Sequence, residues 1–196
     1  MADAADFSCG CGGVQLELRT PPLRVFECYC QDCQAAARHF AGVGGAEQRS
    51  ERPPSGDPGF ASAPVHSADL HLRCGAELLG TLRLRPSSKT LRRYCTRCNT
   101  MLFIIPGALG EGRMKVRALN YNCLAPGLRA ENPLQLRINT EAAVVPLPAD
   151  GVPGRQGLPL RVARTFVGSA LPTCRPTEAA FERPPGEVKL AQAGGA

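Results

Sequence analysis

The 196 residues suit a single domain, long enough to bury a core covering about two-thirds of the unfolded chain's surface. With 21 Gly, 18 Pro and only 5% aromatic residues, the composition favours strands, turns and loops over packed helices, so we expect a mainly β fold. The net charge of +6 is spread along the chain without a block of like charges, which argues against nucleic-acid binding, and no apolar run approaches the ~20 residues of a membrane span.

The first residues have neither the basic start nor the apolar run of a secretory leader, so we expect a cytoplasmic protein. In that reducing compartment its 10 cysteines would stay as thiols, available for metal binding or chemistry rather than for disulfides.

Residues 1–8 read as a loose lead-in, and 14–18 alternate apolar and charged residues as a half-buried strand does. A short strand is predicted over 23–26, and an Ala-rich helix over 34–40. From 42 to 64 the sequence is rich in Gly, Pro and Ser, which predicts a flexible insertion.

The second half of the chain reads mostly as strands, with 101–105 apolar on both faces as a central strand is. We expect them over 69–73, 80–85, 91–94, 101–105, 114–119 and 134–138, with a weaker one over 160–166. The predicted organisation is a domain over 7–140, an extension over 141–174 and a disordered tail over 175–196.

Two pairs of cysteines, each separated by one or two residues, lie far apart in the sequence: Cys9 with Cys11, and Cys95 with Cys98. Such a pair can supply two corners of a tetrahedral zinc site from one tight turn. Together the pairs predict a closed four-thiolate structural site that joins an early strand to a late one.

Cys28, Cys30 and Cys33 supply only three thiolates, and a metal with three protein ligands keeps a position for water or substrate. We therefore predict a second, open zinc site, to which a small thiol could bind. A fourth protein ligand, the absence of metal, or a disulfide between two of the three remain alternatives.

The order Cys-x-Cys-Gly, Cys-x-Cys-x-x-Cys-Gln and Arg-Arg-Tyr-Cys-x-x-Cys resembles the glutathione-dependent formaldehyde-activating enzyme family, also called the centromere-protein-V-like domain, over roughly residues 7–140. The resemblance implies a structural zinc on Cys9, Cys11, Cys95 and Cys98. It also implies a second, catalytic zinc on Cys28, Cys30 and Cys33, and an antiparallel β-tent of the Mss4-like type. The implied activity is that of a zinc-dependent carbon-sulfur lyase acting on adducts of glutathione.

Two features depart from the family pattern. Asn99 follows the last ligand where the family usually has Gly, although Asn also tolerates the left-handed conformation. The insertion over 42–64 replaces sequence that would shape a substrate pocket beside the three-cysteine motif.

Several other residues are candidates for roles at these sites. Gln31 and Asp32 are the nearest polar groups to the three cysteines, and His39 could be a fourth ligand, although a surface histidine is the simpler interpretation. Isolated cysteines are usually small buried hydrophobes, and this applies to Cys74, Cys123 and Cys174. Arginines that could bind the carboxylates of a substrate are Arg83, Arg85, Arg92, Arg93 and Arg97. Arg83 and Arg85 alternate with leucines, so the solvent face of a strand is the simpler interpretation for these two.

The main alternative to the lyase is a zinc-stabilised module that binds another protein. A methionine-sulfoxide reductase is the weakest hypothesis, because that chemistry needs a free nucleophilic cysteine and Cys95 is required as a zinc ligand. The sequence does not identify the substrate or the oligomeric state.

Overall fold

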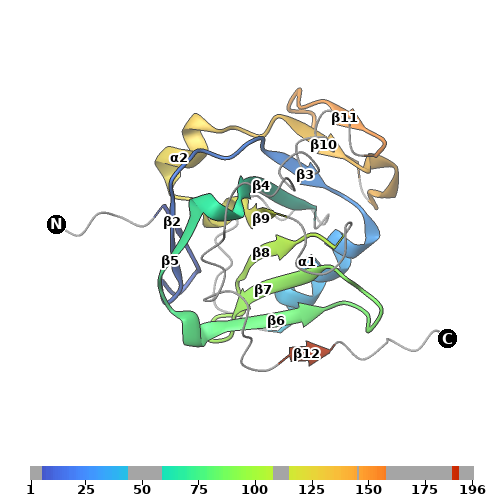
Figure 1. Cartoon of the computed structure of the whole chain (residues 1–196). Helices are drawn as coiled ribbons and strands as arrows, with labels where there is room; N and C mark the ends of the chain where they lie inside the picture. Colours follow the sequence, from blue (N-terminus) through green and yellow to red (C-terminus); the bar gives the residue numbers. More distant parts are fainter. Residues whose placement is uncertain (1–5, 44–58, 108–114, 145, 158–186, 190–196) are drawn as a thin grey trace.

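The structure, a computed structural model, describes residues 6–43, 59–107, 115–144, 146–157 and 187–189. The described residues form one mainly β domain with two sheets and few helices (Figure 1). Its strands are β1 Phe7–Ser8, β2 Gln15–Leu18, β3 Phe26–Cys28, β4 Phe60–His66, β5 Leu70–Cys74, β6 Leu79–Arg83, β7 Leu91–Cys95, β8 Met101–Ile105, β9 Val116–Asn120, β10 Leu136–Ile138, β11 Gly154–Arg155 and β12 Glu187–Lys189. The α-helices are α1 Gln31–Gly42 and α2 Pro126–Glu131, and short 3₁₀ turns lie at Ser67–Asp69, Ala76–Leu78, Tyr121–Cys123 and Thr140–Ala142.

The smaller sheet is antiparallel, in the order β1-β2-β5. The larger one runs β11-β10-β3-β4-β9-β8-β7-β6-β12. Its centre, from β3 to β6, is antiparallel, but β10 pairs parallel with both β3 and β11, and β12 pairs parallel with β6. The expectation of an antiparallel fold is therefore confirmed for the small sheet and for the centre of the large one, and is wrong at the two ends of the large sheet. Parallel pairs need long crossover connections, and here the paired strands lie far apart in the sequence.

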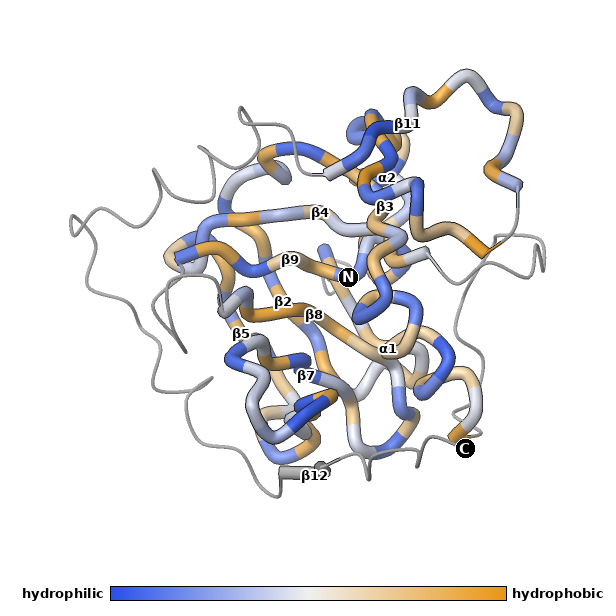
Figure 2. Tube along the Cα trace, turned by 90° about the vertical axis from the view of Figure 1, so that its right-hand side faces the viewer, coloured by the Kyte–Doolittle hydropathy of each residue, from blue (hydrophilic) through white to orange (hydrophobic). Residues whose placement is uncertain are grey.

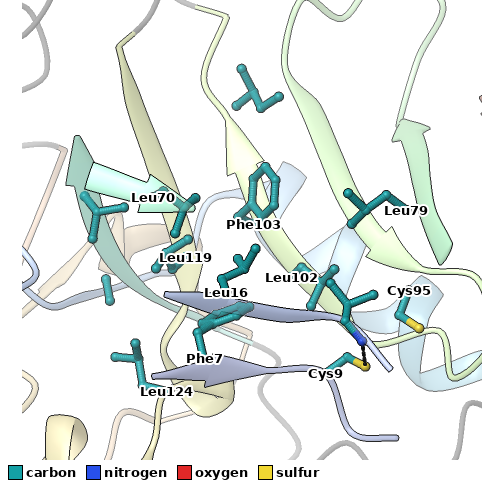
Figure 3. Packing of buried hydrophobic residues seen from close by; sticks show 14 of the residues in the cluster. Phe7, Cys9, Leu16, Leu70, Leu79, Cys95, Leu102, Phe103, Leu119 and Leu124 are labelled. Atoms are coloured by element: carbon teal, nitrogen blue, oxygen red, sulfur yellow. Dashed lines mark hydrogen bonds between the residues drawn. The ribbon is translucent and has the colours of Figure 1, made fainter. Parts of the chain in front are cut away.

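Both faces of the large sheet are covered. On one face, side chains of the small sheet, such as Phe7 and Leu16, pack with Phe103 and Leu119 in one apolar cluster (Figure 3). On the other face, α1 packs in a second cluster with residues such as Ile104. All five residues of β8 are buried, as predicted for a strand apolar on both faces, and apolar segments run through the interior (Figure 2).

Most predicted strands are confirmed within one or two residues, but three segments differ. Phe7 is fully buried in β1, so the lead-in is partly structured. The strand expected over 23–26 lies later in the chain, because β3 begins only at Phe26. Residues 60–64 of the expected insertion belong to β4, while 44–58 lie outside the described residues.

Pro64 shows why that strand reads as a loop. A proline cannot donate a ladder hydrogen bond and argues against a central strand. In β4, however, the Pro64 carbonyl turns away from β9 and accepts a hydrogen bond from Leu23 N–H at 2.8 Å. In a strand the nitrogen and the carbonyl of one residue point to the same side, so the Pro64 nitrogen also faces away from β9. It lies beyond the start of β3, and its missing N–H therefore removes no ladder hydrogen bond to β9.

The helices also differ from the prediction. The helix expected over 34–40 begins at Gln31, because Cys30 has the extended N-cap conformation and Asp32 lies in the first turn. The short α2, with Pro126 at its start, is not predicted. No helix among the described residues is long and apolar enough to cross a bilayer.

The C-terminal predictions are tested only in part. In the extension, β11 pairs with β10, while the weaker strand expected over 160–166 lies outside the described residues. In the tail expected to be disordered, Glu187–Lys189 form β12 against β6, which corrects the prediction for these three residues.

Candidate metal centres

The first centre lies where the small sheet meets the large one. Cys9 and Cys11 belong to the turn between β1 and β2, whereas Cys95 ends β7 and Cys98 lies in the turn between β7 and β8. Figure 3 shows Cys9 and Cys95 at the edge of the apolar cluster. The four Sγ atoms lie within 4.8 Å of one another, so all four predicted ligands are brought together.

The spacing of the sulfurs fits a metal rather than a disulfide. The Sγ atoms of Cys9 and Cys11 are 3.4 Å apart, and those of Cys11 and Cys95 are 3.9 Å apart. A disulfide requires about 2.05 Å, whereas tetrahedral Zn–S bonds of about 2.3 Å put the sulfurs about 3.8 Å apart. This donor set could therefore hold a tetrahedral metal ion.

Tight turns present the two cysteine pairs. In the first, Gly12 N–H donates to the Cys9 carbonyl at 2.9 Å. In the second, Asn99 N–H donates to the Cys95 carbonyl at 2.8 Å. Asn99 has a φ of 52°. This is the left-handed conformation expected at this position, where the family that the cysteine motifs resemble usually has Gly.

Hydrogen-bond donors surround the sulfurs of this four-cysteine centre. Val14 N–H donates to Cys9 Sγ at 3.2 Å, and Cys98 Sγ lies 3.1 Å from Thr100 Oγ1. Arg97 Nε–H donates to Cys11 Sγ at 3.2 Å. Desolvation raises the pKa of Cys11, but the bond from Arg97, with weaker ones from Gly13 N–H and the neighbouring cysteines, lowers it to about 6. The low pKa favours the thiolate that a metal needs.

The second centre lies where β3 leads into α1. Cys28 ends β3, Cys30 is the N-cap of α1, and Cys33 lies in its first turn. Their three Sγ atoms lie within 4.8 Å of one another. Cys28 and Cys33 are buried and Cys30 is half-buried, and all three are free thiols rather than disulfides.

No fourth Cys, His, Asp or Glu ligand atom of the described chain joins this three-cysteine centre within the same limit. His39 is half-buried on α1 and is not part of it. Hydrogen bonds from the neighbouring Cys28 and Cys33 thiols hold the pKa of Cys30 well below its ordinary value. Hydrogen bonds among the three thiols, together with burial, raise the pKa of Cys28 and Cys33, so a metal ion would have to displace their protons. With three sulfurs as donors, the centre could hold a metal ion with one position left for another ligand.

Asn139, which the sequence analysis did not single out, contacts this centre. Its side-chain Nδ2 donates to Cys28 Sγ at 3.2 Å, and its φ is 55°. It directly follows β10, whose Ile138 pairs with Cys28. The only sequence signal is an Asn, a residue that tolerates the left-handed region, at the end of a predicted strand.

The polar side chains that were predicted to support the three cysteines, Gln31 and Asp32, face solvent or another partner instead. The Asp32 carboxylate accepts hydrogen bonds from Arg85 at 2.8 and 2.9 Å, and Gln31 is exposed. Gln34 donates instead to the backbone carbonyls of Tyr29 and Ala142. This amide fixes the turn between β3 and α1 from which Cys30 projects.

The five arginines do not form one cluster. Arg83 donates to the Ser88 carbonyl at 2.7 Å, and Arg85 is mostly exposed. Arg92 and Arg93 are almost fully buried, so the solvent-face interpretation does not extend to them. Arg92 lies beside α1, whereas Arg93 donates to Thr81 Oγ1.

A buried ionic network lies next to Cys28. Glu27 is fully buried, and its Oε2 accepts hydrogen bonds from Tyr29 OH at 2.8 Å and Arg137 Nε at 3.1 Å. Arg137 also binds both carboxylate oxygens of Asp150 at 2.7 Å, which holds the pKa of Asp150 below its usual range. The network joins β3 to β10 and so fixes Cys28 relative to Asn139.

Of the three isolated cysteines, the two that the structure describes, Cys74 and Cys123, are not part of either centre. Cys123 is half-buried, Cys174 lies outside the described residues, and Cys74 is exposed. The prediction of a buried hydrophobe is wrong for Cys74, because it is the last residue of an edge strand.

Comparison with known proteins gives a family without an assigned activity. The model of a family of unknown function (DUF6151) matches residues 1–176. Among curated proteins, none matches the chain. A structural-genomics crystal structure of a Rhodobacter sphaeroides protein is similar at 16% identity with a TM-score of 0.43, covering 76% of this chain and 98% of that one. The chain belongs to the family of unknown function DUF6151.

Proposed function

We propose that the protein binds two zinc ions, one at each cysteine centre. Four thiolates with the observed sulfur spacing match the donors and geometry of structural zinc. At the four-cysteine centre the ion stabilises the fold, because its ligands come from turns in both sheets. Since the ligands must remain thiolates, the protein works in a reducing compartment such as the cytosol.

At the three-cysteine centre the ion binds a small thiol. The observation that carries this proposal is the set of exactly three sulfurs within 4.8 Å, which no other Cys, His, Asp or Glu of the described residues completes. Zinc bound there would lower the pKa of an incoming thiol and orient it. The half-buried Cys30 leaves the centre accessible from the surface.

The proposed reaction is that of a carbon-sulfur lyase acting on adducts of a thiol with an aldehyde. In the cleavage direction the C–S bond breaks and its electron pair stays on sulfur as a thiolate. The hydroxyl of the adduct loses its proton to water, and the O–H electrons form the carbonyl bond. The reverse direction forms the adduct from thiol and aldehyde.

Glutathione and its hydroxymethyl adduct are the proposed substrates, on the strength of the resemblance carried by the cysteine motifs. Arg85 is exposed and lies beside the three-cysteine centre, through its pair with Asp32 in the first turn of α1. It could therefore also bind a substrate carboxylate.

Calorimetric titration with glutathione tests the proposal. Zinc-loaded protein should bind glutathione with micromolar to millimolar affinity and turn over S-hydroxymethylglutathione. Cys30→Ser should abolish both, while Cys74→Ser, which removes an exposed thiol outside both centres, should change neither. Absence of binding at several millimolar, with a protein partner captured through the same surface, would replace the lyase by a protein-binding module.

A further inference from the structure

Arg92 is a buried cation directly beside the three-cysteine centre. Its side chain is only 2% exposed. Its Nη2 donates to the backbone carbonyl of Asp32 at 3.4 Å, in the first turn of α1 between Cys30 and Cys33. In the strand ladder it pairs with Leu82 and Ile104, which share the apolar cluster of Cys28 and Cys33.

The guanidinium lacks the partners that a buried arginine normally has. Among the described residues, neither Nε nor Nη1 of Arg92 has a hydrogen-bond partner. The Asp32 carboxylate on the same turn is engaged by Arg85. Burying a cation without a compensating charge is strongly unfavourable, so an arginine in this position requires negative charge nearby.

The thiolates supply that charge. Burial lowers the pKa of Arg92, and the charges of Cys33, Asp32 and Cys30 act in the opposite direction. Three thiolates around a divalent ion still leave a net negative charge, and a fourth, exogenous thiolate adds to it, whereas water does not.

We infer that Arg92 is the buried counter-charge of the three-cysteine metal centre and makes its remaining position selective for an anionic ligand, a thiolate, over water. The inference rests on the proposed function for the identity of that ligand. Arg92 acts as a positioning residue through electrostatics, because its unpaired nitrogens are closed to solvent and cannot contact a substrate.

Arg93 offers a matched control. It is the next residue on β7 and is 3% exposed, as deeply buried as Arg92. It pairs with Thr81 and Phe103 and lies on the opposite face of the sheet, where it donates to Thr81 Oγ1. Its substitution removes a buried arginine without removing charge from the centre.

The test is titration of reduced, metal-free protein with Co²⁺, whose first equivalent fills the four-cysteine centre and folds the domain. Binding is followed through the thiolate-to-cobalt charge-transfer absorption, and 2-mercaptoethanol is added afterwards. Arg92→Met should weaken binding of the second cobalt about 10- to 100-fold, the usual effect of losing an outer-sphere partner, and should weaken thiol binding further. Arg92→Lys, which keeps the charge, should stay within a few-fold of wild type. Arg93→Met should leave the second site unchanged.

The outcomes separate this inference from the proposed function. If wild type binds two cobalt ions but no thiol, the proposed function is wrong. In that case, weaker binding of the second cobalt by Arg92→Met still supports Arg92 as the counter-charge of the metal centre. If Arg92→Met binds cobalt and thiol as tightly as wild type does, the inference is overturned and the proposed function stands. An equal loss in Arg92→Lys and Arg92→Met, or a similar loss in Arg93→Met, overturns it as well. A wild type that binds one cobalt overturns both.

Discussion

Asn139 donates a hydrogen bond to the sulfur of Cys28 at 3.2 Å, although the two residues are 111 positions apart in the chain. The contact exists because β10 pairs in parallel with β3 and ends beside it. Hydrogen bonds to thiolate ligands orient them and tune a bound metal, so this amide would support metal binding at the three-cysteine centre.

Asn139→Gly should weaken metal binding at the three-cysteine centre about 10- to 100-fold. Glycine adopts the positive φ of Asn139 without strain, so the substitution removes the hydrogen bond and little else. Competition of a chelator for bound metal measures the effect. Asn99→Gly is the matched control, since Asn99 is also left-handed but its side chain donates to the Val43 carbonyl; an equal loss in both variants would contradict a specific role for Asn139.

Arg137→Met should lower the free energy of unfolding by about 3–5 kcal/mol, because it leaves the fully buried Glu27 carboxylate without its ionic partner. Urea denaturation monitored by circular dichroism checks this. Asp150→Asn should have a much smaller effect, since the Asp150 side chain is 46% exposed and water can solvate what remains. A larger loss in Asp150→Asn than in Arg137→Met would show that the exposed pair, not the buried one, stabilises the network.

Asn99→Val should destabilise the turn that presents Cys95 and Cys98 by about 1–3 kcal/mol, because a β-branched residue is strained at a φ of 52°. Asn99→Gly should remain close to wild type. The shift in the urea midpoint at unchanged slope reports the difference. Equal stability of the two variants would mean that this turn does not constrain the fold.

Patterns local in the sequence predicted much of this structure. Alternation of apolar and polar residues over 70–73 predicted β5, and the run 101–105, apolar on both faces, predicted β8. Both patterns are informative because burial of one or both faces of a strand selects apolar residues on those faces. Both groups of cysteines that the structure brings together were predicted from their spacing, because cysteines one or two residues apart can share one tight turn.

Contacts between distant segments were not predictable in the same way. Nothing near Asn139 or Arg137 points to Cys28 or Glu27, because their meeting depends on the parallel pairing of β10 with β3. The arginines beside Cys95 suggested one carboxylate-binding cluster, whereas strand alternation sends Arg92 and Arg93 to opposite faces of the sheet. Pro64 reads as a loop residue because proline cannot donate a ladder hydrogen bond, and the contact that its carbonyl makes with Leu23 N–H comes from a distant part of the sequence.

The most direct test of the account is elemental analysis of protein purified under reducing conditions without added metal, together with the variants Cys98→Ser and Cys33→Ser. Wild type should contain close to two zinc ions per chain. Cys33→Ser should retain one zinc and a folded domain, whereas Cys98→Ser should be unfolded or insoluble, since structural zinc contributes ~10 kcal/mol or more to the folding of small domains. One zinc in wild type that is unaffected by Cys33→Ser, or equal thermal stability of the two variants, would contradict the division into a structural and an open centre.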